Sequence, residues 1–235
     1  MNIAIRTIAA CALIASAGAV FSHESNMPPQ NVLQLSASGS VEVQQDLLVL
    51  TLGTSRDGKE AGAVQSQLRQ ALETALQEAR RSAEPGKMDV RTGQFSLYPR
   101  HGKNGEIVGW QGRVEVVLEG LDFARITATA ARMSTMAIAQ TGFGLSKAER
   151  SRVERQAQSQ AIENFKGQAS ALAQAFGFAG YSLREVVVNS SDSAPGPRPR
   201  MMAMEAKFGG ADAPVPVEAG KSTVEVTVSG SVQMR

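Results

Sequence analysis

The sequence predicts an α+β protein made of two interleaved two-layer α/β sandwich subdomains. Segments in which apolar and polar residues alternate, typical of strands, are interspersed with longer segments of helical periodicity. Residues 46–145 follow the βαββαβ order of a ferredoxin-like sandwich, which we expect as the inner subdomain. The last strand, at 223–233, has no neighbour in sequence to pair with. We therefore expect an outer subdomain that combines residues 32–45 with 146–235 and contains one long Ala-rich helix.

The first part of the chain predicts extended structure followed by a helix. Residues 32–54 alternate as two short strands or one long bent strand. A helix is expected over 59–82, because apolar residues recur there at three- and four-residue spacing. Ser55 or Asp57 is its expected cap, and Pro85 follows its end.

A hairpin and a second helix come next. Residues 88–98 and 107–118 predict strands joined by the polar, glycine-containing segment 101–105. A helix is expected from Asp122, as its cap, to Met133. The core face of the second hairpin strand is expected to carry Val108, Trp110, Val114, Val116 and Leu118.

The third helix has the clearest pattern in the chain. Ser146 and Glu149 form a capping box, in which the hydroxyl and the carboxylate bind backbone N–H groups at the helix start. Gly177 is expected to end the helix. Strands are expected on either side of it, at 136–145 and 181–189. Its buried stripe is expected to consist of Val153, Ala157, Ala161, Phe165, Ala169, Leu172 and Phe176.

Residues 1–21 have the layout of a secretory signal peptide. Arg6 precedes an apolar run from Ile8 to Phe21 that is shorter than the roughly 20 residues of a transmembrane helix. We therefore expect export to the periplasm and removal of this segment. Cys11 is the single cysteine and lies inside it, so the exported protein would have no thiol for disulfides, thiolate catalysis or cysteine-based metal sites. Lipoprotein anchoring at Cys11 is the disfavoured alternative, because the apolar run continues beyond it.

Two phosphate-binding patterns are incomplete. Gly142 and Gly144 precede a helix, but Lys147 stands where a dinucleotide fingerprint has its third glycine. The segment 220–222 matches the end of a phosphate-binding loop, but Val215 occupies the position of its first glycine. We therefore expect no cofactor.

His101 is the one histidine in the part of the chain expected to fold, since His23 lies beside the expected cleavage site. Its loop offers neither a second histidine nor a cysteine to complete a zinc site. A hydrolase that uses His101 is one hypothesis, but the chain lacks the Gly-x-Ser-x-Gly segment that presents a serine nucleophile. We therefore expect no catalytic residues and a protein that is not an enzyme.

Three methionines in an expected long loop over 190–220 are the candidate metal ligands. Met201, Met202 and Met204 carry thioethers, which bind Cu(I) and react with oxidants. The competing interpretation is a short apolar segment that packs on the protein or on a neighbouring subunit. The cluster thus makes a periplasmic ligand-binding or Cu(I)-binding module the alternative function.

Four segments, taken in order, carry a family pattern. They are LSASGSVEV at 35–43 with Asp46 after it, VRTGQFSLYP at 90–99 with Gly109 and Trp110, ALAQAFG at 171–177, and PVEAG at 216–220. Together they resemble the SIMPL-domain family, which includes bacterial periplasmic immunogenic proteins and proteins associated with oxidative-stress defence. Gln45 and the pair Gly112-Arg113 depart from the family's usual residues. The resemblance implies an exported α+β protein, homo-oligomeric in at least some members, with no agreed catalytic residues.

These observations predict a non-enzymatic exported protein that self-assembles and supports the cell envelope, with a role in oxidative-stress defence. Its expected partners are further copies of itself, and it is expected to associate peripherally with the envelope without a transmembrane span. The 235 residues include 24 Lys and Arg against 22 Asp and Glu, and this net charge of +2 gives no reason to expect nucleic-acid binding. Edge strands and the loop over 190–220 are the expected means of joining subunits.

Overall fold

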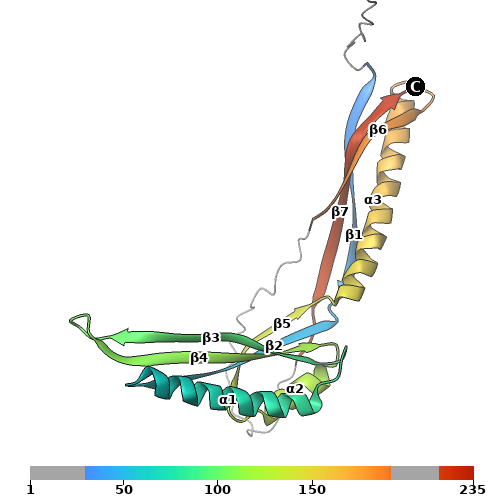
Figure 1. Cartoon of the computed structure of the whole chain (residues 1–235). Helices are drawn as coiled ribbons and strands as arrows, with labels where there is room; N and C mark the ends of the chain where they lie inside the picture. The colour runs from blue at the N-terminus through green and yellow to red at the C-terminus, as the bar shows by residue number, and fades with distance from the viewer. Residues whose placement is uncertain (1–29, 192–216) are drawn as a thin grey trace, which may run out of the picture.

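The computed structural model describes residues 30–191 and 217–235, which form two units set at an angle to each other (Figure 1). The expected leader, and residues 192–216 of the expected loop, lie outside the described residues. The inner unit contains β2 (Leu47–Gly58), α1 (Ala61–Ser82), β3 (Asp89–His101), β4 (Ile107–Gly120), α2 (Phe123–Arg132) and β5 (Ala137–Gly144). The outer unit contains β1 (Val32–Gln44), α3 (Lys147–Ala175), β6 (Tyr181–Ser191) and β7 (Lys221–Met234).

The inner unit has the ferredoxin-like arrangement predicted from its βαββαβ order. Its antiparallel sheet has the strand order β3-β4-β2-β5, and α1 and α2 cover one face (Figure 1). Because side chains alternate along a strand, Leu48, Leu50 and Leu52 of β2 all point into the buried core. The opposite face carries charged pairs such as Arg113 and Glu115, whose Nε and Oε1 atoms are 3.0 Å apart. The predicted α+β fold is therefore confirmed.

Two details of the inner unit differ from the prediction. α1 begins at Ala61, and Glu60 is its N-cap residue without a side-chain hydrogen bond. The expected caps, Ser55 and Asp57, lie within β2, because the pairing of β2 with β4 continues as far as Gly58. Val108, expected in the core, is exposed because the β3–β4 hairpin extends beyond α1 (Figure 1).

The outer unit places the last strand at the centre of its sheet. β7 pairs antiparallel with β1 along its whole length and with β6 on its other side. The two ends of the described chain thus meet in one sheet, as the interleaved arrangement predicts. Val226 and Val228 of β7 are buried beneath α3, while Glu225 is exposed on the opposite face. α3 lies mainly along β1 and β7 and makes few contacts with β6.

α3 approaches β1 closely because both elements present small residues. The buried stripe of the helix includes Ala157 and Ala161 at its centre. Gly39 of β1 lies directly against this part of the helix, where a Cβ would collide with the carbonyl oxygen of Ala157 and the amide nitrogen of Ala161. Asn164 Nδ2 donates a hydrogen bond of 2.9 Å to the carbonyl oxygen of Ser38. Glycine is therefore needed at position 39 for close approach.

The C-terminal end of the stripe differs from the prediction. Phe176 is 65% exposed, although it was expected to be buried. Four-residue spacing from Ala169 leads to Ala173, which takes the last buried position. Gly177 has a positive φ of 81° and ends the helix as predicted.

A hydrogen-bonded link between the two units surrounds the start of α3. Ser146 Oγ accepts a hydrogen bond of 3.2 Å from the backbone N–H of Glu149, as the capping box predicts. The other half of the box differs, because the Glu149 carboxylate binds Arg152 at 2.6 and 2.9 Å. The carboxylate of Asp46 takes the place of the Glu149 carboxylate. It accepts hydrogen bonds of 2.6 Å each from the backbone N–H and the hydroxyl of Ser146. One carboxylate therefore ties the β1–β2 connection to the β5–α3 connection.

Candidate functional site: the open face and edge of the outer sheet

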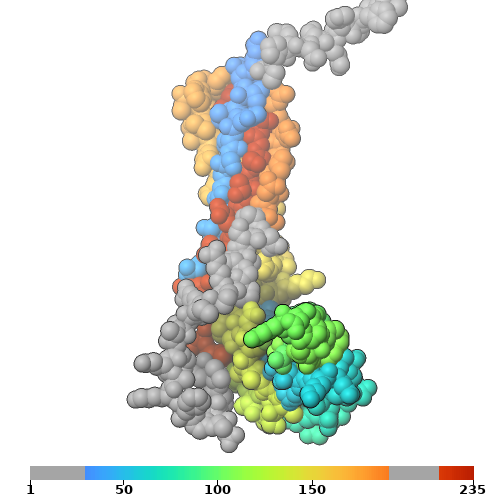
Figure 2. Space-filling model, turned by 90° about the vertical axis from the view of Figure 1, so that its left-hand side faces the viewer, coloured from blue at the N-terminus to red at the C-terminus, as the bar shows by residue number. Residues whose placement is uncertain are grey.

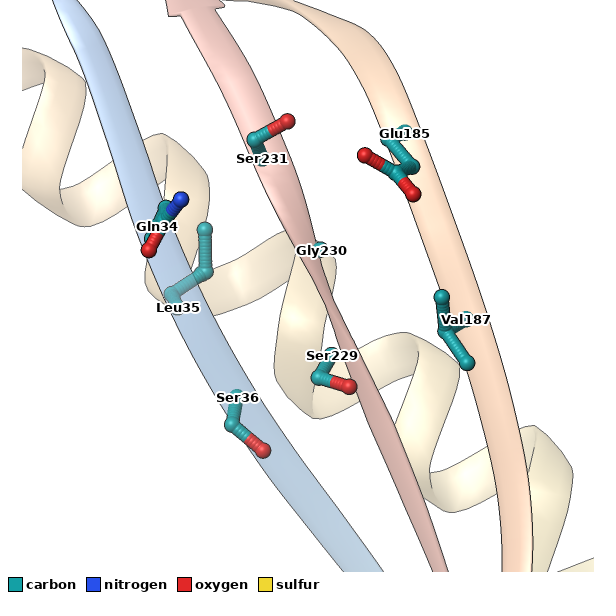
Figure 3. Close-up of a pocket in the computed structure, with 8 residues that line it drawn as sticks. All are labelled: Gln34, Leu35, Ser36, Glu185, Val187, Ser229, Gly230 and Ser231. Carbon is teal, nitrogen blue, oxygen red and sulfur yellow. The ribbon is translucent and has the colours of Figure 1, made fainter.

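The main candidate site is a groove on the face of the outer sheet opposite α3 (Figure 3). Its volume is about 480 Å³. All three strands contribute, and the space-filling view shows β1, β7 and β6 side by side, with β6 at the margin (Figure 2). The lining residues are Gln34, Leu35 and Ser36 of β1, Ser229, Gly230 and Ser231 of β7, and Glu185 and Val187 of β6.

A bulge in β6 shapes this groove. The pairing of β6 with β7 shifts between Leu183 and Glu185, and such an extra residue increases the local twist of a sheet. Gly230 lies next to the bulge, where a Cβ would collide with the carbonyl oxygen of Glu185. The glycine thus lets the bulged strand come close, and Glu185 stands opposite Ser231.

The groove is lined by several hydrogen-bonding groups. Its polar groups are the hydroxyls of Ser36, Ser229 and Ser231, the Gln34 amide and the Glu185 carboxylate (Figure 3). Nucleophilic catalysis by a serine needs a base within hydrogen-bonding reach. Within the described ranges, no hydrogen bond is found between these serines and the Glu185 carboxylate. The hydroxyl, amide and carboxylate groups of the groove can form hydrogen bonds to a polar surface.

β6 forms one edge of the outer sheet, and its apolar side chains are exposed. The exposed fraction is 54% for Leu183, 42% for Val186, and 44% for both Val187 and Val188. Val186 and Val188 lie on the same face as α3, but the helix covers β1 and β7 instead. Val187 lines the groove on the other face. The sequence predicts this strand but not its exposure, because a run of three valines is equally typical of a buried strand.

The residues that the sequence singled out do not meet at this surface. His101 is the last residue of β3 in the inner unit, where its exposed ring Nδ1 lies 3.1 Å from the carbonyl oxygen of Gly105. Met201, Met202 and Met204 lie outside the described residues, so the Cu(I)-binding alternative rests on the sequence alone. In the part of the chain that is described, no group of three or more His, Cys, Asp or Glu residues is placed to hold a metal ion.

A cluster of charged residues joins α2 to the turn after α1. Arg125 contacts Glu84 at 2.8 Å and Asp122 at 3.2 Å, while Lys87 contacts Glu84 at 2.6 Å. Asp122 also caps α2 as predicted, accepting from the backbone N–H of Arg125 at 3.0 Å. The hydrogen bond from Lys87 lowers the pKa of Glu84, and those from the backbone and side chain of Arg125 lower the pKa of Asp122. These charges are paired with one another and join α2 to the turn after α1.

We expect this cluster to make the protein less stable in acid. A carboxyl group whose pKa is lowered by folding stabilises the native state above its unfolded pKa of about 4. That contribution is lost as the pH falls through the lower native pKa. The Arg125→Gln variant should be less stable than the wild type near neutral pH and should lose less stability on acidification.

Urea unfolding at about pH 7 and about pH 3 measures this difference. Arg69→Gln is the control, because Arg69 lies 3.9 Å from Glu73 on the exposed face of α1 and the side chains of both residues are mostly exposed. An Arg125→Gln variant whose stability falls between the two pH values as steeply as that of the wild type would contradict the assignment.

Comparison with known proteins identifies the family. The sequence profile of the family described as "SIMPL: Protein of unknown function (DUF541)" matches residues 33–232. The chain belongs to the SIMPL family. The match begins in β1 and ends in β7, so it includes both units and all the residues that line the groove. The resemblance seen in the sequence is thereby confirmed.

Further comparisons do not assign a function to this SIMPL protein. No curated protein matches it. One similar solved structure is "The crystal structure of AtUAH in complex with glyoxylate", with 13% identity and a TM-score of 0.21 over 48% of this chain and 29% of that chain. The complex of AtUAH with (S)-hydroxyglycine has 16% identity and a TM-score of 0.19 over the same shares. The SIMPL protein thus spans less than a third of those chains, and likeness at these TM-scores supports no inference.

A membrane span sets requirements on both the length and the composition of a helix. Crossing a bilayer takes about 20 mostly apolar residues. None of the described helices meets both the length and the apolar character that this requires. α3, although it has 29 residues, alternates its alanine stripe with charged residues such as Arg152 and Glu163.

Proposed function

We propose that this SIMPL protein is an exported, non-enzymatic periplasmic protein that self-assembles and supports the cell envelope during oxidative stress. The signal-peptide pattern of residues 1–21 supports export. The exposed apolar edge of β6 supports self-assembly, and this is the observation that carries the proposal. The family is one of unknown function, and the groove offers hydroxyls suited to contact with a polar surface.

Within the described ranges, the valine-containing part of the β6 edge carries few of the features that protect an edge strand. Natural proteins protect edge strands with charges, prolines, bulges or covering segments. Residues 186–190 are Val-Val-Val-Asn-Ser, without a charge or a proline, and the bulge lies before them. Burial of exposed apolar surface contributes about 25 cal/mol per Å². Burial of these valines would thus favour association, against the entropy that two chains lose when they bind.

The absence of cysteine from the exported chain suits a role under oxidative stress. Cys11 is the single cysteine, and it is expected to leave with the signal peptide. Oxidants convert exposed thiols to sulfenic acids and disulfides, which would cross-link or distort an assembly. A protein without a thiol avoids these cysteine reactions.

Sedimentation velocity of the protein purified from the periplasm tests the assembly. We expect species larger than one chain at tens of micromolar, and a monomer at that concentration would contradict the proposal. A strain that lacks the protein should be more sensitive to peroxide and to detergent. The full-length gene should restore resistance, whereas a gene without codons 2–21 should not. Equal resistance of the deletion strain and its parent would contradict the envelope role.

A further inference from the structure

We infer that two copies of this chain join through their β6 strands, antiparallel about a two-fold axis at Val187, into one continuous six-stranded sheet. Each copy contributes its three strands, in the order β1-β7-β6 followed by β6-β7-β1. The inference rests on the proposed self-assembly and names its surface and its partner, which is a second copy of this chain.

β6 has one edge without a strand partner in the described ranges. β7 occupies one edge of β6, and no strand among residues 30–191 and 217–235 pairs with the other edge. Alternate backbone N–H and C=O groups along that edge have no strand partner within these ranges, and backbone pairing is how such edges are usually satisfied.

The sequence of β6 complements itself when two copies run antiparallel about Val187. Val187 then lies opposite the partner's Val187, and Val186 lies opposite the partner's Val188. Directly opposed β-branched residues are favourable cross-strand pairs. All three valines, which are 42–44% exposed in the single chain, thus cover one another.

The same register avoids opposed charges. Glu185 stands opposite the partner's Asn189, and Arg184 stands opposite the partner's Ser190. A pairing centred between Arg184 and Glu185 would join opposite charges, but the bulge at that point interrupts the regular edge. The regular part of β6 begins at Glu185 and includes all three valines. The centre at Val187 is therefore favoured.

The other edge of the sheet is a poorer candidate for this contact. β1 has no exposed large apolar residue along its described length, and its outward side chains include Ser36, Ser38 and Glu42. Glu42 is held in an ion pair with Lys221 at 2.6 Å. Self-pairing of β6 also closes at two copies, as an isologous interface does.

Pairing of two chains through β6 places their two grooves side by side. A two-fold axis perpendicular to the sheet keeps like faces on the same side, because directly opposed residues point the same way. Both α3 helices then lie on one side, and the two grooves lined by Ser36, Ser229 and Ser231 lie on the other. Val187 borders each groove, so the grooves meet at the axis (Figure 3). The pair of chains presents one hydroxyl-lined surface of twice the length.

A charge placed at the axis tests the interface. In the Val187→Lys variant two like charges oppose each other, and we expect the Kd for pairing to rise at least about tenfold in sedimentation equilibrium. The matched control is Gln34→Lys, which adds the same charge to the same face of the sheet but on β1. Its Kd should stay at the wild-type value, and circular dichroism should show both variants folded.

Mixing two variants tests the two-fold axis itself. Val187→Lys and Val187→Glu should each pair weakly alone and should recover wild-type affinity when mixed, because position 187 faces position 187. Failure to recover would overturn the register. As a second measurement, in a Cys11→Ser background a short bis-maleimide should link Val187→Cys chains into dimers and leave Ser36→Cys chains unlinked.

The outcomes separate this inference from the proposed function. A wild-type protein that is monomeric contradicts the proposed self-assembly, and with it the inference. A wild-type oligomer that Val187→Lys leaves unchanged, or that links through Ser36→Cys instead of Val187→Cys, overturns the β6 interface and leaves self-assembly standing.

Discussion

Replacement of Phe165 by alanine is expected to lower the free energy of unfolding by about 3–5 kcal/mol. Phe165 is 2% exposed and is the one aromatic side chain in the buried stripe of α3, whose other members are Val153 and alanines. Phe165 belongs to the core cluster between α3 and the outer sheet, and a packed core relaxes only partly around the space that a lost ring leaves. Urea unfolding followed by circular dichroism measures the loss.

Phe176→Ala provides the matched control in the same helix region. Its ring is 65% exposed, so the same substitution should change the free energy of unfolding by less than about 0.5 kcal/mol. Equal losses in the two variants would show that the ring of Phe176, and not that of Phe165 alone, packs in the core, contrary to the structure.

Gly39→Val is expected to destabilise the protein by about 1–3 kcal/mol or more. Its Cβ would collide with the carbonyl oxygen of Ala157 and the amide nitrogen of Ala161, which are backbone atoms and cannot rotate aside. α3 would have to move away from β1, and the contacts of its alanine stripe would be lost. A lower midpoint in thermal unfolding, together with a lower urea midpoint, reports this effect.

Gly167→Ala is the control for Gly39→Val, because it tests whether any added side chain in or near α3 lowers the free energy of unfolding. Gly167 lies in α3, and no neighbouring side chain or distant backbone atom comes within 4 Å of the place that an alanine Cβ would take. Alanine should therefore stabilise the helix by up to about 1 kcal/mol. If Gly39→Val were as stable as the wild type, the close approach of α3 to β1 would be wrong.

Local pattern was sufficient to predict the order of elements and the inner topology. The alternation along β2 and the helical spacing along α1 each reflect one buried face, and a chain of βαββαβ order has few ways to bury those faces. The start of α3 was also predictable, since the Ser146 cap depends on residues within one turn.

Features that depend on distant residues were not predictable in this way. Asp46 replaces the Glu149 half of the capping box, and it lies 100 residues before Ser146 in the chain. The cap of α1 was misplaced because the pairing with β4 carries β2 past Ser55 and Asp57. Local sequence gives no signal for either, since both follow from tertiary contacts.

The residues of the candidate surface could be predicted only in part. The sequence predicts β6 as a strand, but whether Val186 and Val188 are buried depends on where α3 lies on the sheet. The groove brings Ser36 of β1 beside Ser229 of β7, and the β6 bulge places Glu185 opposite Ser231. Only the assembled sheet shows this set of residues.

Native mass spectrometry of the protein released from the periplasm by osmotic shock tests the central claim most directly. The account predicts complexes with an even number of chains, each lacking the signal peptide and each free of a bound prosthetic group. A mass of one chain, or a chain that retains residues 1–21, would contradict it.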